Sequence, residues 1–413
     1  PNAHRRKRLP PPHPASRLGR MPVGLKQRVE ILKQLYRNAK LLILDEPTAV
    51  LTPSEVKDLF NTIRELKNAG TSIIFISHKL HEPLEIADRI VTIRRGEIVG
   101  EVLPDNTTKE ELAQMIVGRK IVTKLERVKS ESTNKILEVE SLSIMDNYGV
   151  KHITEASFDV YTSRILGVAG VHGNGQSELI EGIMGLRSGV SGKINLYLED
   201  GYRENLVGKS TMDIYKLNIA FIPEDRSTQG LISDFPISEN VWLGFYNLKD
   251  RASEYVQSSE NEKSTKIRLQ LNKFLIPMQL MKKITKKIMD VLDVRAENED
   301  VKISQLSGGN QQKVIIGREF AKNPCLIIAS EPTRGVDIGV MENVHEQLIQ
   351  LRNSGVGVIL VSSDLDEILK LSDDIMIMYE GQIVSYRPIE EYTMNDISQL
   401  MTSGTISNEE VKI

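Results

Sequence analysis

Residues 170–178 are the part of this sequence best suited to chemistry, because they combine closely spaced glycines with small polar side chains. An apolar run over 165–169 leads into Gly-Val-His-Gly-Asn-Gly-Gln-Ser-Glu, and a helical pattern follows. Apart from Gln176, this is the phosphate-binding pattern G-x-x-x-x-G-K-[ST]. Glycines let the backbone curl around phosphate groups with its N–H groups pointing inward, at a helix N-terminus whose dipole favours an anion. The residues expected to contact a nucleotide here are Gly170, Gly173, Asn174, Gly175, Gln176, Ser177 and Glu178.

A second set of candidate residues emerges when the chain is compared with itself at the fixed offset that places Leu41 opposite Leu326. Leu41–Thr48 reads LLILDEPT and returns as LIIASEPT at 326–333, and residues 23–29 return at 308–314 without a gap between the two matches. This pattern indicates a tandem duplication. The second copy begins near Ile136, so the first should begin before the printed sequence. We therefore expect about 150 residues of the first copy, including its phosphate loop, to be missing.

Strands alternating with helices must position these residues. Helices are predicted over 25–38, 53–69 and 80–88, buried strands over 40–45 and 71–77, and a β pair over 89–99. Such an alternation predicts an α/β fold with a mostly parallel sheet covered by helices on both faces. The segment 236–305 has a largely helical pattern and is inserted between the phosphate loop and the second copy of residues 23–29.

The predicted domain organisation follows from these patterns. Residues 1–20 contain six Lys or Arg, five Pro and no acidic residue, and a disordered or artefactual basic tail is expected there. The remaining predicted divisions are the C-terminal part of the first copy at 21–118, a linker at 119–135, the second copy at 136–400 with a helical subdomain at about 232–318, and a C-terminal tail at 401–413.

Composition limits the classes of function. A chain of 413 residues suggests two or three domains, and its formal net charge of −3 gives no reason to expect a nucleic-acid partner. The single cysteine, Cys325, rules out an intramolecular disulfide and suits a reducing compartment. No apolar stretch reaches the roughly 18 residues that a transmembrane helix needs, so any membrane role is expected to be peripheral.

The motifs together resemble one family. Leu306–Lys313 (LSGGNQQK) resembles the signature motif of ATP-binding-cassette (ABC) ATPases, Leu41–Glu46 resembles their Walker B strand, and His78 is similar to their switch histidine. The loop Gly173–Ser177, the stretch Ile222–Arg226 (IPEDR) and the tandem layout resemble the fused ATPase subunit of bacterial importers for sugars and, more closely, nucleosides.

This resemblance implies a fold, partners and a location. The fold would be two P-loop cassettes in tandem, the first incomplete. The cofactors would be ATP and Mg²⁺. The partners would be integral-membrane permease subunits, fed by a substrate-binding lipoprotein, and the chain would work at the cytoplasmic face of the cell membrane. By the same resemblance, Glu224–Leu231 and the helical insert would face the permease.

The resemblance also implies one competent site, because ATP in this family lies between two cassettes. Asp45 would hold Mg²⁺, Glu46 would polarise the attacking water, and His78 would contact the γ-phosphate. From the second copy, the signature residues would contact the same nucleotide. These are Ser307, Gly308, Gly309 and Gln311.

The other site is degraded by comparison with the family. Gln176 replaces the lysine, Ser330 the Walker B aspartate and Ser363 the switch histidine, and Met21-Pro22-Val23-Gly24 replaces the signature. Ser177 remains as a possible metal ligand and Glu331 survives. We expect a site that holds nucleotide without turning it over. Tyr148 could stack on adenine, and it could equally be an ordinary loop tyrosine.

Two other interpretations stay open at this level. A soluble tandem cassette protein acting on ribosomes would also lack membrane spans, but such proteins resemble one another in having two intact phosphate loops. An inactive fragment that folds and binds nucleotide is the more serious alternative, and the chain as written is expected to have little or no ATPase activity by itself. Whether the solute is a nucleoside or a sugar rests on the resemblance alone.

Overall fold

The computed structural model describes most of the chain in two compact units, Pro1–Ile121 and Val122–Ile413, and each is described by itself. The described residues are 33, 40–48, 53–77, 79–94, 96–117, 130, 132–171, 173–198, 201–245, 278–336 and 338–405. The predicted helix over 25–38, His78 and Met21–Gly24 lie outside this set, as do the tail at 1–20 and most of the linker.

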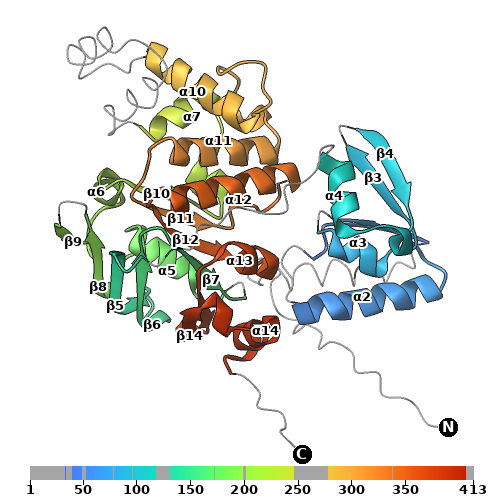
Figure 1. Cartoon of the computed structure of the whole chain (residues 1–413), viewed down its shortest axis with the longest axis horizontal. Coiled ribbons are helices and arrows are strands. Elements are labelled where there is room, and N and C mark those ends of the chain that lie inside the picture. Colours follow the sequence, from blue (N-terminus) through green and yellow to red (C-terminus); the bar gives the residue numbers. More distant parts are fainter. Residues whose placement is uncertain are drawn as a thin grey trace, which may run out of the picture. The chain divides into compact units, whose positions relative to one another are not determined.

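The described residues of the first unit form two small sheets and three helices (Figure 1). Its elements are β1 (Leu41–Asp45), α2 (Pro53–Asn68), β2 (Ser72–Ile76), α3 (His81–Ile86), β3 (Ile90–Arg94), β4 (Glu97–Val102), the 3-10 turn η2 (Pro104–Asn106) and α4 (Lys109–Val117). Strands β1 and β2 are parallel, whereas β3 and β4 form an antiparallel pair. The predicted strands, the helix over 53–69 and the β pair are thus confirmed, and the helix expected over 80–88 is shorter than predicted.

The prediction that strands β1 and β2 are buried on both faces is wrong. Leu42 and Leu44 pack with Phe60 of α2 in a small core, but the side chains on the other face are open to solvent. Ile43 is 59% exposed and Ile74 is 48% exposed. In the described part of this unit, α2 covers only one face of the two strands, so an all-apolar strand leaves alternate side chains uncovered.

The second unit is built around a six-stranded sheet with the order β10-β11-β12-β7-β13-β14. Its strands are β5 (Lys135–Met145), β6 (Lys151–Tyr161), β7 (Ile165–Ala169), β8 (Val190–Tyr197), β9 (Arg203–Asn205), β10 (Ile219–Ile222), β11 (Leu326–Ser330), β12 (Gly357–Ser362), β13 (Asp374–Tyr379) and β14 (Gln382–Pro388). Its helices are α5 (Gln176–Ile183), α6 (Thr211–Lys216), α7 (Ile237–Leu243), α10 (Met278–Leu292), α11 (Gly308–Phe320), α12 (Ile338–Asn353), α13 (Leu365–Leu371) and α14 (Met394–Ser403), with the short turns η3 (Arg226–Gly230), η4 (Ile303–Gln305) and η5 (Ile389–Glu391). All neighbouring strands of this sheet are parallel except β14, which is antiparallel to β13.

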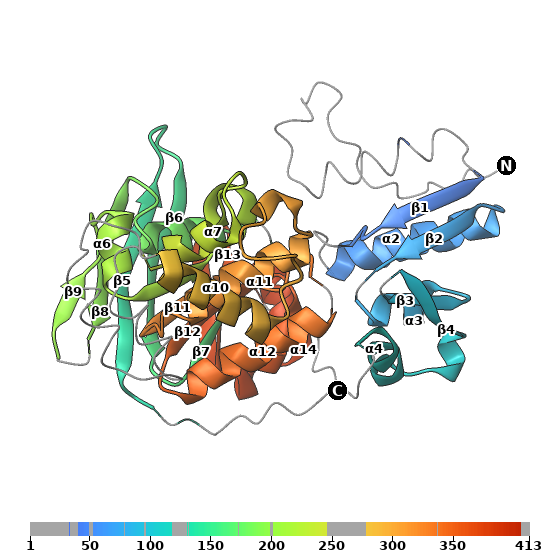
Figure 2. The ribbon, with the colours of Figure 1, turned by 90° about the horizontal axis from the view of Figure 1, so that it is seen from above.

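Different layers cover the two faces of this sheet (Figure 2). On one face, an apolar core joins the strands to α7, α10, α11 and α12. On the other, the core joins them to α5 and to a second, four-stranded antiparallel sheet with the order β6-β5-β8-β9. The expectation of helices on both faces missed this second sheet. Strands β5 and β6 have their apolar residues alternating with polar ones, which is typical of an antiparallel sheet with one buried face.

The internal repeat reappears in the strand pairing. Leu41 lies opposite Ser72 between β1 and β2, and Leu326 lies opposite Gly357 between β11 and β12. The surroundings differ, however. In the second unit β7 lies between β12 and β13, whereas β2 and β3 belong to separate sheets. Accordingly Ile328, the counterpart of exposed Ile43, is fully buried.

A buried ionic cluster anchors α11, the helix that begins with the signature residues. Arg318 donates from Nη1 to the carbonyl oxygen of Gly230 at 3.0 Å. Glu319 accepts a hydrogen bond from the backbone N–H of Phe221 at 3.1 Å and pairs with Lys322. Burial lowers the pKa of Lys322 to about 8, although the nearby charge of Glu319 acts in the opposite direction. The cluster fastens α11 to β10 and to the turn η3 that follows it.

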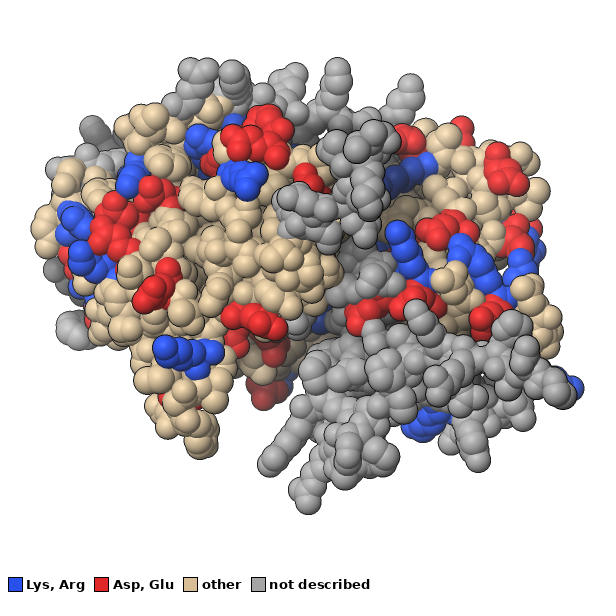
Figure 3. Space-filling view, turned by 90° about the horizontal axis from the view of Figure 1, so that it is seen from below, with Lys and Arg blue, Asp and Glu red and all other residues tan. Residues whose placement is uncertain are grey.

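No helix among the described residues is long and apolar enough to span a bilayer. The described surface carries charges of both signs. Figure 3 shows Lys and Arg side chains interspersed with Asp and Glu on one face.

Candidate functional site

The glycine-rich loop lies where the sequence predicts it, between the fully buried strand β7 and helix α5. Gly173 has a φ of 93° and Gly175 a φ of 102°, a region that disfavours side chains. A Cβ atom on Gly175 would lie 2.8 Å from Cδ1 of Ile153 and 3.1 Å from the carbonyl oxygen of His152. Glycine is therefore required at this position both by the backbone conformation and by the close approach of β6.

Gln176, which replaces the lysine of the phosphate-binding pattern, is turned back into the loop. Its Nε2 donates to the carbonyl oxygen of Val171 at 3.3 Å, and its side chain is only 7% exposed. A Cβ atom on Gly170 would collide with this same Nε2. The amide thus occupies the space directly over Gly170, and it brings no positive charge to the loop.

Ser177, the predicted metal ligand, is engaged by a protein carboxylate. Its Oγ donates to Oε2 of Glu224 at 3.0 Å, while Nη1 of Arg334 contacts Oε1 of Glu224 at 2.7 Å. Three segments far apart in sequence therefore meet at this point. Sequence reasoning assigned Glu224 to a permease-facing surface and missed its contact with Ser177, because nothing in the sequence indicates this pairing.

Asn174 fastens the loop to the C-terminal part of the unit. Its Oδ1 accepts from the backbone N–H of Glu380 at 3.2 Å, and its Nδ2 donates to the carbonyl oxygen of Met401 in α14 at 3.2 Å. Its own carbonyl oxygen accepts from the N–H of Gly381 at 3.0 Å. The loop is thereby held to the turn between β13 and β14 and to α14.

Tyr148 lies at the tip of the β5–β6 hairpin and is 92% exposed. The carboxylate of Asp146 orders this tip, since its Oδ1 accepts from the N–H groups of Tyr148 and Val150, both at 2.9 Å. Hydrogen bonds from Val150 and Tyr148 and the neighbouring His152 hold the pKa of Asp146 below its usual value. His152 contacts Asp146 and also lies 3.8 Å from Glu178 in α5, so the base of the hairpin reaches the phosphate loop. Stacking of Tyr148 on adenine stays a prediction.

Glu331 follows β11 in a backbone conformation that few non-glycine residues adopt, with a φ of 47°. Its N–H donates to the carbonyl oxygen of Val361 at 2.8 Å, and its Oε1 accepts from the N–H of Ser363 at 2.7 Å. Burial and the charge of Glu367 raise the pKa of Glu331 to about 7, with a smaller contribution from Glu224. A pKa in this range suits a general base, so the carboxyl group of Glu331 does not by itself make this site inactive.

The signature residues begin α11. Ser307 is the N-cap residue, but its side chain caps no backbone N–H; its Oγ instead accepts from Nδ2 of Asn310 at 3.0 Å. A Cβ atom on Gly308 would collide with Nη2 of Arg226, whereas Gly309 has open space around it. Gln311 donates from Nε2 to the carbonyl oxygens of Ile303 and Leu306 and so fixes the approach to the helix.

In the first unit, Asp45 and Glu46 stand at the carboxyl end of β1. Glu46 has a φ of 44°, close to that of its counterpart Glu331, and its N–H donates to the carbonyl oxygen of Ile76 at 2.9 Å. Asp45 is exposed. Because the two units are described separately, the grouping of Asp45 and Glu46 with the signature residues of the second unit stays a prediction.

A magnesium ion fits the two units unequally. The described residues contain no group of three or more His, Cys, Asp or Glu side chains placed to hold a metal. In the second unit, the position of the Walker B carboxylate is held by Ser330, which is 4% exposed, and Ser177 already donates to Glu224. In the first unit, Asp45 offers the carboxylate oxygen that Mg²⁺ prefers.

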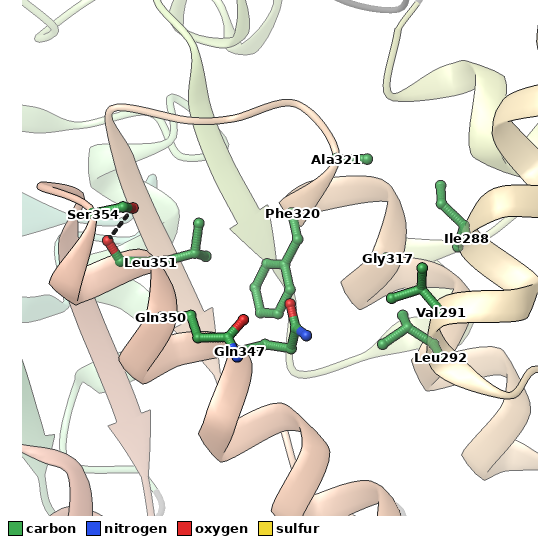
Figure 4. Close-up of a pocket in the computed structure, with 10 residues that line it drawn as sticks. All are labelled: Ile288, Val291, Leu292, Gly317, Phe320, Ala321, Gln347, Gln350, Leu351 and Ser354. Atoms are coloured by element: carbon green, nitrogen blue, oxygen red, sulfur yellow. Dashed lines mark hydrogen bonds between the residues drawn. The ribbon is translucent and has the colours of Figure 1, made fainter. Parts of the chain in front are cut away.

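A cavity of about 300 Å³ lies away from this loop, between α10, α11 and α12. Its lining is mainly apolar, with Phe320 at its centre and the amides of Gln347 and Gln350 at one side (Figure 4). It contains no titratable side chain, so it offers no acid–base chemistry.

Comparison with known proteins agrees with these features. Residues 153–334 match the family described as ABC transporter. The chain is 40% identical over 385 residues to the nucleoside import ATP-binding protein NupA of Lactococcus lactis, covering 93% of this chain and 71% of that protein. It is 40% identical over 394 residues to the guanosine import ATP-binding protein NupO of Bacillus subtilis, covering 95% and 72%.

A sugar-import relative is more distant than these two. The chain is 34% identical over 398 residues to the xylose import ATP-binding protein XylG of Moorella thermoacetica, covering 95% of this chain and 73% of that protein. Such identity over most of the length of each relative exceeds what a shared fold alone would produce. The chain belongs to the ATP-binding subunits of ABC transporters, a family of P-loop ATPases.

Proposed function

We propose that this chain is the ATP-hydrolysing motor subunit of an importer for nucleosides. The identity to the two nucleoside-import relatives, 40% in each case, exceeds the 37% to a glucose import ATP-binding protein of Haloferax volcanii and the 34% to the xylose-import relative. Its partners would be integral-membrane permease subunits and, through them, a substrate-binding lipoprotein. The chain would act at the cytoplasmic face of the membrane, and the solute would not touch it.

The proposal includes a division of labour between two ATP sites. The competent site would use Asp45, Glu46 and His78 of the first copy together with the signature residues that begin at Ser307. The second site, at residues 170–177, would hold nucleotide without turnover. The observation that carries this division is the state of the second loop, where Gln176 brings no charge and the hydroxyl of Ser177 donates to Glu224.

The chemistry assigned to each residue follows from its place. Glu46 would orient the attacking water and draw its proton, and His78 would donate to the γ-phosphate oxygens. The start of α11, with Gly309 in open space, would present backbone N–H groups and a helix N-terminus to the same phosphate. Mg²⁺, held by Asp45, would neutralise charge on the phosphate oxygens.

Uptake by cells tests the proposal directly. A bacterial strain that lacks nucleoside import is supplied with this gene and its permease and lipoprotein genes, and uptake of radiolabelled guanosine is measured. Excess unlabelled nucleoside should abolish the signal, and excess xylose or ribose should not. Suppression by the sugars alone would identify a sugar importer. Absence of any ATP-dependent uptake would favour the inactive fragment.

A further inference from the structure

A fully buried glutamate joins the two loops that carry the proposed catalytic residues of the first unit. Glu82, in the first turn of α3, has no exposed surface. Thr48 donates from Oγ1 to Oε1 of Glu82 at 2.5 Å, and Ser77 donates from Oγ to Oε2 at 2.5 Å. Thr48 lies two residues after Glu46 and Ser77 immediately precedes His78. One carboxylate thus fixes the loop after β1 to the loop after β2.

Part of this arrangement recurs at the repeat-related positions of the second unit. Glu367, 3% exposed, accepts from Oγ1 of Thr333 at 2.9 Å, whereas its Oε2 has no hydrogen-bond partner among the described residues. The backbone around it repeats as well: the N–H of Asp364 donates to Oγ of Ser362 at 3.0 Å, and the N–H of Lys79 donates to Oγ of Ser77 at 3.0 Å.

The backbone link between the two loops is also duplicated. The N–H of Glu46 donates to the carbonyl oxygen of Ile76 at 2.9 Å, and the N–H of Glu331 donates to that of Val361 at 2.8 Å. Two copies that differ in their functional residues therefore keep the same framework. The hydrogen bonds that join the two loops are therefore present whether or not the proposed catalytic side chains are.

The two copies differ in the residue that packs beside the buried glutamate. Where the first unit has buried Phe60, the second has buried His345, whose Nε2 lies 2.8 Å from Oε1 of Glu367. Burial alone would raise the pKa of Glu367, but its neighbours, with His345 contributing most, together outweigh it and hold the pKa below its usual value. In both units the buried carboxyl group accepts side-chain hydrogen bonds, as a buried polar group must.

We propose that Glu82 is a positioning residue for ATP hydrolysis, which ties the loop after Glu46 to the end of β2 through its hydrogen bonds with Thr48 and Ser77. Glu367 makes the equivalent bond to Thr333 in the second unit. The catalytic part of this proposal rests on the proposed function. The clamp itself rests only on the hydrogen bonds within each unit, so the existence of the clamp and its role in catalysis can be tested separately.

The first test measures the clamp without any need for activity. Glu82→Gln replaces one oxygen by an NH₂ group that donates and cannot accept, so one of the two hydroxyl donors loses its acceptor. Hydrogen–deuterium exchange of the full chain should become faster by about threefold or more around both Thr48 and Ser77, and stay unchanged in the second unit. The matched variant Glu367→Gln should speed exchange around Thr333 and leave the first unit unchanged.

Variants of the two donors keep this test decisive if Glu82→Gln unfolds the first unit. Thr48→Val removes one donor and leaves the carboxylate in place, and Ser77→Ala does the same on the other side. Each should loosen its own loop. The exposed neighbour Glu85, which pairs with Arg64, provides the control Glu85→Gln. Unchanged exchange around Thr48 and Ser77 in all variants would show that no clamp exists.

The second test measures turnover in membranes that contain the permease and a chain whose first copy includes its phosphate loop. A positioning role predicts that Glu82→Gln lowers kcat by about 10- to 100-fold, because small displacements of catalytic groups are costly, while KM for ATP stays within about twofold. Glu85→Gln should leave both unchanged. A change in KM alone, or no change in kcat, would overturn the catalytic role. Absence of turnover in the unmodified chain would overturn the proposed function, and the exchange experiment would still decide on the clamp.

Discussion

At the scale of single residues, the two copies differ most where charge is needed. The second copy has Ser330 and Ser363 where the first has Asp45 and His78, and Gln176 where the phosphate-binding pattern has a lysine. Glu331 keeps its carboxyl group, but Ser330 leaves it without a neighbouring carboxylate to hold a metal ion. Glu46, in contrast, retains Asp45 beside it. We therefore expect Glu46 and Glu331 to contribute unequally to ATP turnover.

Replacing each glutamate by glutamine tests this inequality. In membranes with the permease and a chain whose first copy includes its phosphate loop, Glu46→Gln should lower ATP turnover by about 10²-fold or more, because it removes the residue proposed to position the attacking water. Glu331→Gln should leave most of the turnover, since Ser330 supplies no metal ligand there. Phosphate release under saturating ATP is the measurement. Equal losses in the two variants would mean that both sites work.

The raised pKa of Glu331 also makes stability depend on pH. The folded state keeps the proton up to about pH 7, whereas the unfolded state loses it near the ordinary value for glutamate. The folded state thus binds more protons across this window, and the free energy of unfolding falls as the pH rises through it. Glu331→Gln does not titrate, so its stability relative to the unmodified chain should increase from pH 5 to pH 8 by about 1–3 kcal/mol, reduced by partial solvent exposure.

Urea unfolding followed by tryptophan fluorescence suits this measurement. Trp242 is the single tryptophan of the chain, and it is buried in the second unit, so its signal reports that unit alone. The exposed residue Glu346 provides the control Glu346→Gln, which should run parallel to the unmodified chain. If the unfolding free energy of Glu331→Gln also changes with pH in parallel with that of the unmodified chain, Glu331 has an ordinary pKa.

At the scale of elements, the same strand has different surroundings in the two copies. Ile43 in β1 is 59% exposed, and its counterpart Ile328 in β11 is fully buried in the core that the sheet shares with α5 and the antiparallel sheet. The difference arises because α5 and the antiparallel sheet cover the outer face of β11, whereas the described residues of the first unit include no such layer.

Alanine substitution at these two positions should therefore have unequal costs. Ile328→Ala should destabilise the second unit by about 2–5 kcal/mol, the usual cost of a large-to-small change in a core. Ile43→Ala should change the stability of the first unit by less than about 0.5 kcal/mol, as is usual for exposed positions. Trp242 fluorescence follows the first variant, and hydrogen exchange of α2 follows the second. A large loss for Ile43→Ala would show that its face is covered in solution.

At the scale of the whole molecule, the carboxylates proposed for catalysis belong to the first copy, whereas the described phosphate loop belongs to the second. A single restored lysine cannot make the second site complete. Gln176→Lys should tighten nucleotide binding by about 10- to 150-fold, corresponding to a charge-assisted contact of roughly 1.5–3 kcal/mol. ATP turnover should not rise, because Ser330 and Ser363 are unchanged.

Two assays separate these effects. Binding of a fluorescent ATP analogue to the full chain measures affinity, and phosphate release measures turnover. Gln176→Glu is the matched variant of opposite charge and should weaken binding. Higher turnover in Gln176→Lys would mean that the second site lacked only its lysine, and the division of roles proposed above would be mistaken.

Motif spacing and periodicity by themselves determined the α/β class, the internal repeat and the identity of the loop at 170–178. These features are local, or they depend on comparing one stretch of sequence with another. The described strands of the first unit fall close to their predicted bounds for the same reason. The family follows from several such local motifs in one order.

Only the tertiary structure revealed which side chains meet across long separations. The pairing of Ser177 with Glu224, and the clamp that Glu82 makes with Thr48 and Ser77, depend on how strands are ordered in a sheet, which no local pattern encodes. The exposure of Ile43 is likewise set by what packs on the sheet and not by the strand itself. Burial and pairing are properties of the assembled layers, because each side chain meets its partners only after distant segments have packed together.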